Sequence, residues 1–247
     1  VYYIAIFGAV SGAGIFGTQF YGKGDYKGQR HAFRFKMYAC IVFALVTIVL
    51  FITAGTPLIS LYLNDTGGVG DIQKALEFGQ GYLRIMIIGI IPFAIGQAYI
   101  STVRETGETF VPMLASIAAV FINLVLDYML IFGKFGAPEL GVEGAAAATV
   151  VARFVELMIV VIWTHVNSSR NQFIIGAYKS FEIPADILFA IIKKGTPLML
   201  NEFLWAAGMA TISQCYAVRG LDVVAAQNIS STIANLFNTV YIQMGGS

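Results

Sequence analysis

The stretch "NLVLDYMLIFG", residues Asn123–Gly133, places a carboxylate, Asp127, inside a run of Leu, Val, Ile, Met and Phe. Asn123 stands four residues before Asp127, so the two side chains share one face if the segment is helical. An ionisable group in a bilayer core costs about 2.5–3.5 kcal/mol on insertion scales, and it therefore needs protein or water around it. The fold class of the chain therefore depends on whether this stretch lies in a membrane or in the core of a soluble protein.

The chain has too few charged residues to form a surface that is compatible with water. Of the 247 residues, 57% are hydrophobic and 12% are charged, against about 25% charged in average soluble domains. We therefore expect an integral membrane protein. The formal net charge of +1 gives no reason to expect a nucleic-acid partner. The sequence has no Gly-rich phosphate loop, nucleophile–base set or metal-ligand spacing, so we expect no enzyme and no cofactor.

About 20 mostly apolar residues are needed to cross a bilayer as a helix. This criterion predicts an all-α, polytopic helix bundle with seven spans. The predicted spans are residues 1–20, 37–63, 81–103, 109–133, 142–166, 187–217 and 222–245. The sixth is too long for a straight span, and we expect it to begin as a surface helix near Pro184.

The charges of the connecting segments alternate along the chain. The segments 21–36 and 167–195 are basic, whereas the connections between them are neutral or acidic. The basic residues of the first segment are Lys23, Lys27, Arg30, Arg34 and Lys36. Because positive residues concentrate on the cytoplasmic side, we expect segments 21–36 and 167–195 to be cytoplasmic in a multi-pass cell-membrane protein.

Five ionisable residues fall within the predicted spans, namely Arg84, Asp127, Arg153, Glu156 and Glu202. Arg84 is near the end of its span, where a long side chain reaches the membrane interface. Arg153 and Glu156 are three residues apart on one predicted helix and are expected to neutralise each other.

The segments 109–133 and 142–166 are predicted to be neighbouring antiparallel helices. Gly144, Ala148 and Ala152 recur at four-residue steps, which favours close helix packing in lipid. At about 1.5 Å per residue, Thr149 reaches a depth similar to that of Asn123 and Asp127. Their oxygen atoms suit a small hard cation or a proton, although hydrogen bonding that only joins the helices explains them equally well.

A second polar group lies in "GTPLMLNEFLWAAGMA", residues 195–210. Glu202 follows Pro197 by five residues, and a proline there interrupts the helical hydrogen-bond ladder. Asn201 and Trp205 add an amide and an aromatic face beside the carboxylate. This mixture suits a cationic amphipathic small molecule, while a purely structural role for Glu202 stays open.

The chain resembles the multidrug and toxic compound extrusion (MATE) transporters along nearly its whole length. The resemblance rests on five stretches, "GTQFYGKGDYKGQRHAFRFK", "NLVLDYMLIFG", "GVEGAAAATVVARFVE", "GTPLMLNEFLWAAG" and "VVAAQNISSTIANLFNTVYIQMGGS". It implies a twelve-helix, two-lobe fold, of which this chain would hold a piece from within the second helix to within the eighth. Residues 1–166 would belong to the N-lobe without its first helix, 167–186 to a cytoplasmic linker, and 187–247 to the start of the C-lobe.

The resemblance also implies a function. Members of the family export organic cations or drugs in exchange for Na⁺ or H⁺, by alternating access. It assigns the cation site to Asn123, Asp127 and Thr149, with Na⁺ at Asp127 the one metal ion expected. Glu202, with Asn201 and Trp205 beside it, is assigned to substrate or proton coupling. The expected partners are cationic amphipathic small molecules and the lipid bilayer, and we expect a monomer.

Two alternative functions belong to other classes of membrane protein. A lipid-linked oligosaccharide flippase of the related superfamily needs several cationic side chains to bind pyrophosphate, and the spans offer only Arg84 and Arg153. A seven-helix receptor matches the number of predicted spans. A retinal-binding pump would need a lysine in the last span, and residues 222–245 contain none.

Overall fold

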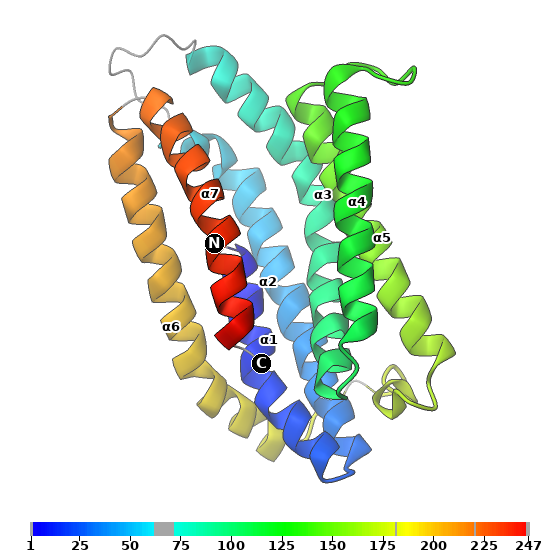
Figure 1. The fold of residues 1–247 in the computed structure, drawn as a ribbon. Helices are drawn as coiled ribbons and strands as arrows, with labels where there is room; N and C mark the ends of the chain where they lie inside the picture. The colour runs from blue at the N-terminus through cyan, green and yellow to red at the C-terminus, as the bar shows by residue number, and fades with distance from the viewer. Residues whose placement is uncertain (1, 62–71, 181, 220, 246–247) are drawn as a thin grey trace.

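The computed structural model describes residues 2–61, 72–180, 182–219 and 221–245. Within these ranges the chain forms seven α-helices and one short 3-10 helix, which confirms the predicted all-α fold (Figure 1). The elements are α1 (Tyr2–Gly22), α2 (Tyr26–Ser60), α3 (Ile72–Glu105), α4 (Phe110–Phe132), α5 (Val142–Val166), η1 (Gln172–Ile174), α6 (Ala185–Ala217) and α7 (Leu221–Gly245).

The start of α2 differs from the prediction. The helix begins at Tyr26 and not near residue 37, so residues 26–36 are helix where a loop was expected. The carboxylate of Asp25 caps the helix by accepting a hydrogen bond of 2.9 Å from the N–H of Gly28. With 35 residues, α2 is about 52 Å long, which exceeds the roughly 30 Å hydrocarbon core. Hydropathy identifies only the apolar part of such a helix.

Among the described residues, four helices, α2 to α5, are long and apolar enough to cross a membrane. The crossing of α1, α6 and α7 stays a prediction. The sixth predicted span is one continuous helix, α6, which begins directly after Pro184 and contains Pro197.

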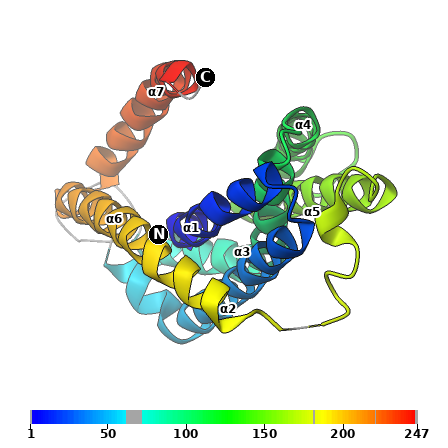
Figure 2. The same cartoon turned by 90° about the horizontal axis from the view of Figure 1, so that it is seen from below.

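The helices are arranged as a packed group with an outer pair. α1, α2 and α3 contact one another, and α5 packs against both α3 and α4. On the other side α6 lies along α1, and α7 follows it (Figure 1). The view along the bundle shows α7 well separated from α4 (Figure 2). The resulting core has an aromatic part, which contains Phe33, Tyr99 and Phe173.

The two basic segments lie at the same end of the bundle, the lower end in Figure 1. Arg34, on the first turns of α2, joins them. Its guanidinium donates hydrogen bonds to the carbonyl oxygens of Ala177 (2.8 Å), Glu182 (3.0 Å) and Gly176 (2.9 Å). The segment between α5 and α6 is therefore fastened to α2. The division into an N-lobe, a linker and a C-lobe stays a prediction.

The close packing of α4 and α5 follows the small-residue pattern. Gly144, Ala148 and Ala152 are all buried on α5. A Cβ atom at Gly144 would lie 2.7 Å from the carbonyl oxygen of Leu130 on α4, which is closer than real Cβ atoms approach. The backbones of the two helices therefore meet at Gly144.

We expect Gly144→Ala to destabilise the protein by about 1–3 kcal/mol, because the added methyl group must push α5 away from α4. Gly208→Ala on α6 is the matched control, since among the described residues no atom outside its own stretch of helix lies within 4 Å of the added Cβ. The control should be neutral or stabilise by up to about 1 kcal/mol, from helix propensity. Thermal melting of the purified full-length protein in detergent measures both variants. Equal melting temperatures would contradict the close approach.

A candidate cation site between α4 and α5

Asn123 and Thr149 meet across the interface of α4 and α5, in agreement with the similar membrane depth predicted for them. The side-chain amide of Asn123 lies 3.5 Å from the hydroxyl oxygen of Thr149, at the long limit of a hydrogen bond. The Thr149 hydroxyl also donates a bond of 2.9 Å to the carbonyl oxygen of Ala145. The contact between the two side chains is therefore weak and leaves their oxygen atoms able to accept another partner.

A cavity of about 170 Å³ opens beside this contact. Its lining consists of Ser116, Ala119, Val120, Asn123, Thr149, Ala152, Arg153 and Glu156. One water molecule occupies about 30 Å³ of liquid volume, so the cavity has room for a few waters or a partly hydrated small ion. Five of these eight residues are polar, and they give such an occupant hydrogen-bond partners.

The far side of the cavity holds the predicted ion pair. An Arg153 guanidinium nitrogen lies 2.9 Å from Glu156 Oε2, and Ser116 donates a hydrogen bond of 2.8 Å to Oε1. The Arg153 guanidinium also lies over the ring of Phe93, 5.2 Å from its centre. Glu156 is 6% exposed, and both of its carboxylate oxygens are satisfied. The expectation that Arg153 and Glu156 neutralise each other is confirmed.

Asp127 lies one helical turn beyond the cavity. The antiparallel register that pairs Ser116 with Glu156 and Asn123 with Thr149 places Asp127 opposite Ala145. Among the described residues, Asp127 Oδ1 is buried without a hydrogen-bond partner. A buried polar atom left unpaired costs free energy, so this oxygen favours a proton or a cation. The polar groups form a row along α4 and α5, with the unsatisfied carboxylate at one end.

The second predicted group lies elsewhere in the bundle. Glu202 is half-buried on α6, close to Gly8 of α1, and Asn201 and Trp205 beside it are exposed. α6 packs against α1, whereas α4 packs against α5. The structure therefore brings Asn123 and Thr149 together but does not join them to Glu202. Arg84 is exposed on α3.

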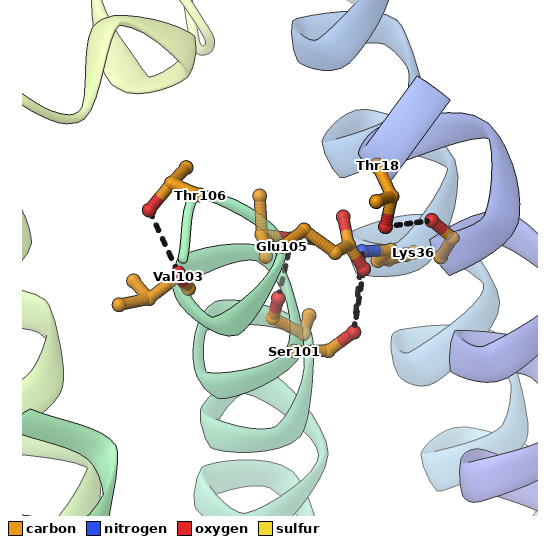
Figure 3. A network of polar contacts seen from close by, with 9 residues as sticks. Thr18, Lys36, Ser101, Val103, Glu105 and Thr106 are labelled. Atoms are coloured by element: carbon orange, nitrogen blue, oxygen red, sulfur yellow. Dashed lines mark hydrogen bonds and ion pairs between the residues drawn. The ribbon is translucent and has the colours of Figure 1, made fainter. Parts of the chain in front are cut away.

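A buried ion pair that the sequence analysis missed joins α2 to α3 (Figure 3). Lys36 was assigned to a loop, but its side chain is fully buried and forms a salt bridge with Glu105 at the end of α3. The Lys36 ammonium also donates hydrogen bonds to the hydroxyl groups of Ser101 (3.2 Å) and Thr102 (3.1 Å). The two charged residues are 69 positions apart, so no local pattern reveals their contact.

Helix α1 completes the surroundings of this pair. A Cβ atom at Gly14 would lie 3.0 Å from a carboxylate oxygen of Glu105, and one at Gly17 would lie closer still. The two glycines therefore let α1 rest directly on the Glu105 carboxylate. The ion pair sits where α1, α2 and α3 meet, and we interpret it as a fixed structural contact.

Long apolar helices with polar groups between them define a polytopic membrane protein as the class of protein. A family model described as MatE matches residues 1–129, about half of the chain. The chain belongs to this family of transporters, which confirms the resemblance seen in the sequence.

The curated relatives are multidrug resistance proteins. The chain is 30% identical over 211 residues to the probable multidrug resistance protein NorM of Thermotoga maritima, covering 85% of this chain and 44% of that protein. It is 23% identical over 213 residues to the multidrug resistance protein NorM of Vibrio cholerae, covering 85% and 45%. The chain thus spans less than half the length of these relatives.

Solved structures show the same fold. The chain is similar to the Vibrio cholerae MATE transporter VcmN in its bent form, with a TM-score of 0.64 and 21% identity over 93% of this chain and 50% of that one. A transporter of the MOP superfamily from Pyrococcus furiosus gives a TM-score of 0.70 with 20% identity, covering 95% and 50%. At these identities the likeness establishes the architecture.

We expect Glu105→Ala to destabilise the protein by about 3–5 kcal/mol, because the buried ammonium of Lys36 loses its counter-charge. Arg104→Ala, at the exposed neighbouring residue, should change stability by less than about 0.5 kcal/mol. The double variant Lys36→Met/Glu105→Leu removes both charges and should recover most of the loss. Thermal melting in detergent measures all three, and a Glu105→Ala variant as stable as the control would contradict a structural role.

Proposed function

We propose that this chain forms part of a secondary antiporter that exports organic cations or drugs in exchange for Na⁺ or H⁺. The observation that carries the proposal is the row of polar groups between α4 and α5, which ends in the unsatisfied buried oxygen of Asp127. Membership of the MatE family supports export as the function and gives no support to a receptor. The names of the multidrug resistance relatives support drugs as the substrates.

The mechanism that we propose uses Asp127 as the exchangeable charge. A proton or Na⁺ neutralises its carboxylate, and Asn123 and Thr149 supply further oxygen atoms one turn along the helices. With its charge neutralised, the α4–α5 pair no longer has a buried anion to solvate, and its preferred packing changes. That change would be coupled to alternating exposure of the substrate to the two sides of the membrane.

Substrate binding is proposed for a separate face, at the side of α6 that carries Glu202. Its carboxylate supplies a negative charge, and the exposed ring of Trp205 supplies an aromatic face for a cation with an apolar body. Separation of the ion site from the substrate site means that the two ligands compete through a conformational change and not through direct contact.

We propose that the end of the bundle with the two basic segments faces the cytoplasm, following the positive-inside rule. α4 then runs outward from Phe110 to Phe132, and Asp127 lies nearer the outer side. A coupling ion that enters from outside would meet Asp127 first and the Asn123–Thr149 contact next.

We expect Asp127→Asn to abolish ion-coupled efflux while the protein still inserts in the membrane, because an amide cannot exchange a positive ion. Efflux of a fluorescent cationic dye from vesicles that contain the full-length protein measures the loss. Glu139→Gln, an exposed carboxylate in the α4–α5 connection, is the matched control and should transport normally. Normal dye efflux by the Asp127→Asn variant would overturn the proposed role.

The coupling ion can be identified by counterflow of the same dye under an imposed gradient of either Na⁺ or H⁺. We expect one of the two gradients to drive dye accumulation, and substitution of Thr149 by alanine to weaken that response about tenfold, as one lost ion–oxygen contact of about 1.4 kcal/mol predicts. Dye movement that follows only its own gradient, whichever ion is imposed, would indicate a channel.

A further inference from the structure

A large pocket lies at the basic end of the bundle, away from the α4–α5 site. Its volume is about 610 Å³. Two parts of the chain form it, the first turns of α2 and the segment that leads into α6. Its lining consists of Lys27, Arg30, His31, Arg34, Gly176, Lys179, Ser180, Glu182, Ile183 and Pro184.

The charge of this pocket is strongly unbalanced. Four of the lining residues carry permanent positive charges and one more is a histidine, whereas Glu182 is the only carboxylate in the lining as described. Like charges held together in a concave surface repel one another and raise the potential inside it. An anionic ligand would relieve that repulsion.

Only part of this charge is used by the fold. Arg34 directs its N–H groups to three carbonyl oxygens and is therefore a structural residue. By contrast, Arg30 Nε and His31 Nδ1 are buried without a hydrogen-bond partner among the described residues. His31 as a whole is only 8% exposed. Those two nitrogens are inaccessible, whereas Lys27 and Lys179 are exposed in the lining, so their ammonium groups can contact a ligand.

The start of α6 brings helix-end N–H donors to the pocket, and Asp186 in its first turn offsets part of their positive potential. Pro184 lines the pocket and precedes the first residue of α6, and it makes no side-chain cap hydrogen bond. The first N–H groups of a helix carry a partial positive charge, and they bind phosphate groups in many proteins. The pocket thus combines guanidinium, ammonium and helix-end donors, which is the chemistry of a phosphate site.

The position of the pocket suggests where the phosphate comes from. Because α2 is long and apolar enough to cross a membrane, a pocket on its first turns would lie near the lipid headgroups. Next to it, α6 exposes Phe189 (68%) and Ile192 (47%), which are apolar side chains that suit acyl chains. A free phosphate ester on the cytoplasmic side would use the same donors.

We propose that this pocket binds a phosphate group, either the headgroup of an anionic phospholipid or a soluble phosphate ester. The bound phosphate bridges the start of α2 to residues 176–180 and 182–184 and so holds these parts of the connection between α5 and α6 in place. This site is distinct from the proposed transport sites, and its test does not require transport.

The test uses the full-length protein in detergent and the double variant Arg30→Gln/Lys179→Gln, which leaves Arg34 intact. Native mass spectrometry measures binding of added phosphatidylglycerol, with phosphatidylcholine as the uncharged comparison. Calorimetry measures binding of soluble glycerol phosphate. The control is Lys23→Gln/Lys193→Gln, which removes the same charge from exposed residues outside the pocket.

We expect the pocket variant to bind phosphatidylglycerol or glycerol phosphate about 25-fold more weakly, as roughly fivefold for each basic residue near a membrane surface predicts. The control should change by about twofold, because its charges are more distant and screened. Binding of the lipid alone identifies a headgroup site, and binding of glycerol phosphate identifies a soluble ligand. The proposal would be overturned if the pocket variant and the control variant lost the same affinity. It would also be overturned if the protein bound phosphatidylcholine as tightly as phosphatidylglycerol, or if it bound neither phosphatidylglycerol nor glycerol phosphate. If the double variant fails to fold, Lys179→Gln alone should weaken binding about fivefold.

Discussion

At Gly144 the backbone of α5 lies against the carbonyl group of Leu130 on α4, and no side chain separates them. Lipid provides no hydrophobic driving force between helices, so their association depends on such close packing of small residues. This approach fixes the register in which Asn123 faces Thr149 and Ser116 faces Glu156. Because the Asn123–Thr149 contact is already 3.5 Å long, a wider separation of the helices would break it.

The charged groups within the bundle divide into those paired with an opposite charge and those without such a partner among the described residues. Glu156 accepts bonds from Arg153 and Ser116, and Lys36 pairs with Glu105 while donating to two hydroxyl groups. Each of these carboxylates is paired with a cationic side chain, so its charge is already balanced. Asp127 has a buried oxygen without a partner among the described residues. Among the described residues, the lack of a pairing cation, and not burial alone, separates Asp127 from these structural charges and makes it the candidate for ion exchange.

The sequence predicted the helices well where apolar runs end sharply. The segments 109–133 and 142–166 agree with α4 and α5 within one residue. The predicted start of α2 was wrong because the first three turns of the helix are polar and lie beyond the apolar stretch that hydropathy detects. The same error placed Lys36 in a loop, and its contact with Glu105 depends on the packing of α2 against α3.

Within the site, helical spacing and similar depth were enough to predict that Asn123 and Thr149 meet. They could not show how far the cavity extends along α4, and it ends one turn before Asp127. The pocket formed by α2 with residues 176–180 and 182–184 could not be predicted from the sequence either, because it joins segments that are far apart in the chain.

Equilibrium binding of the coupling ion to the full-length protein tests the central claim most directly. Calorimetry with NaCl at constant ionic strength, together with proton release followed by a pH indicator, detects either ion without any transported drug. We expect one Na⁺ to bind or one proton to be exchanged per molecule through the carboxylate of Asp127, and this signal to disappear when the carboxylate is replaced by an amide. An unchanged signal after that replacement would contradict the central claim.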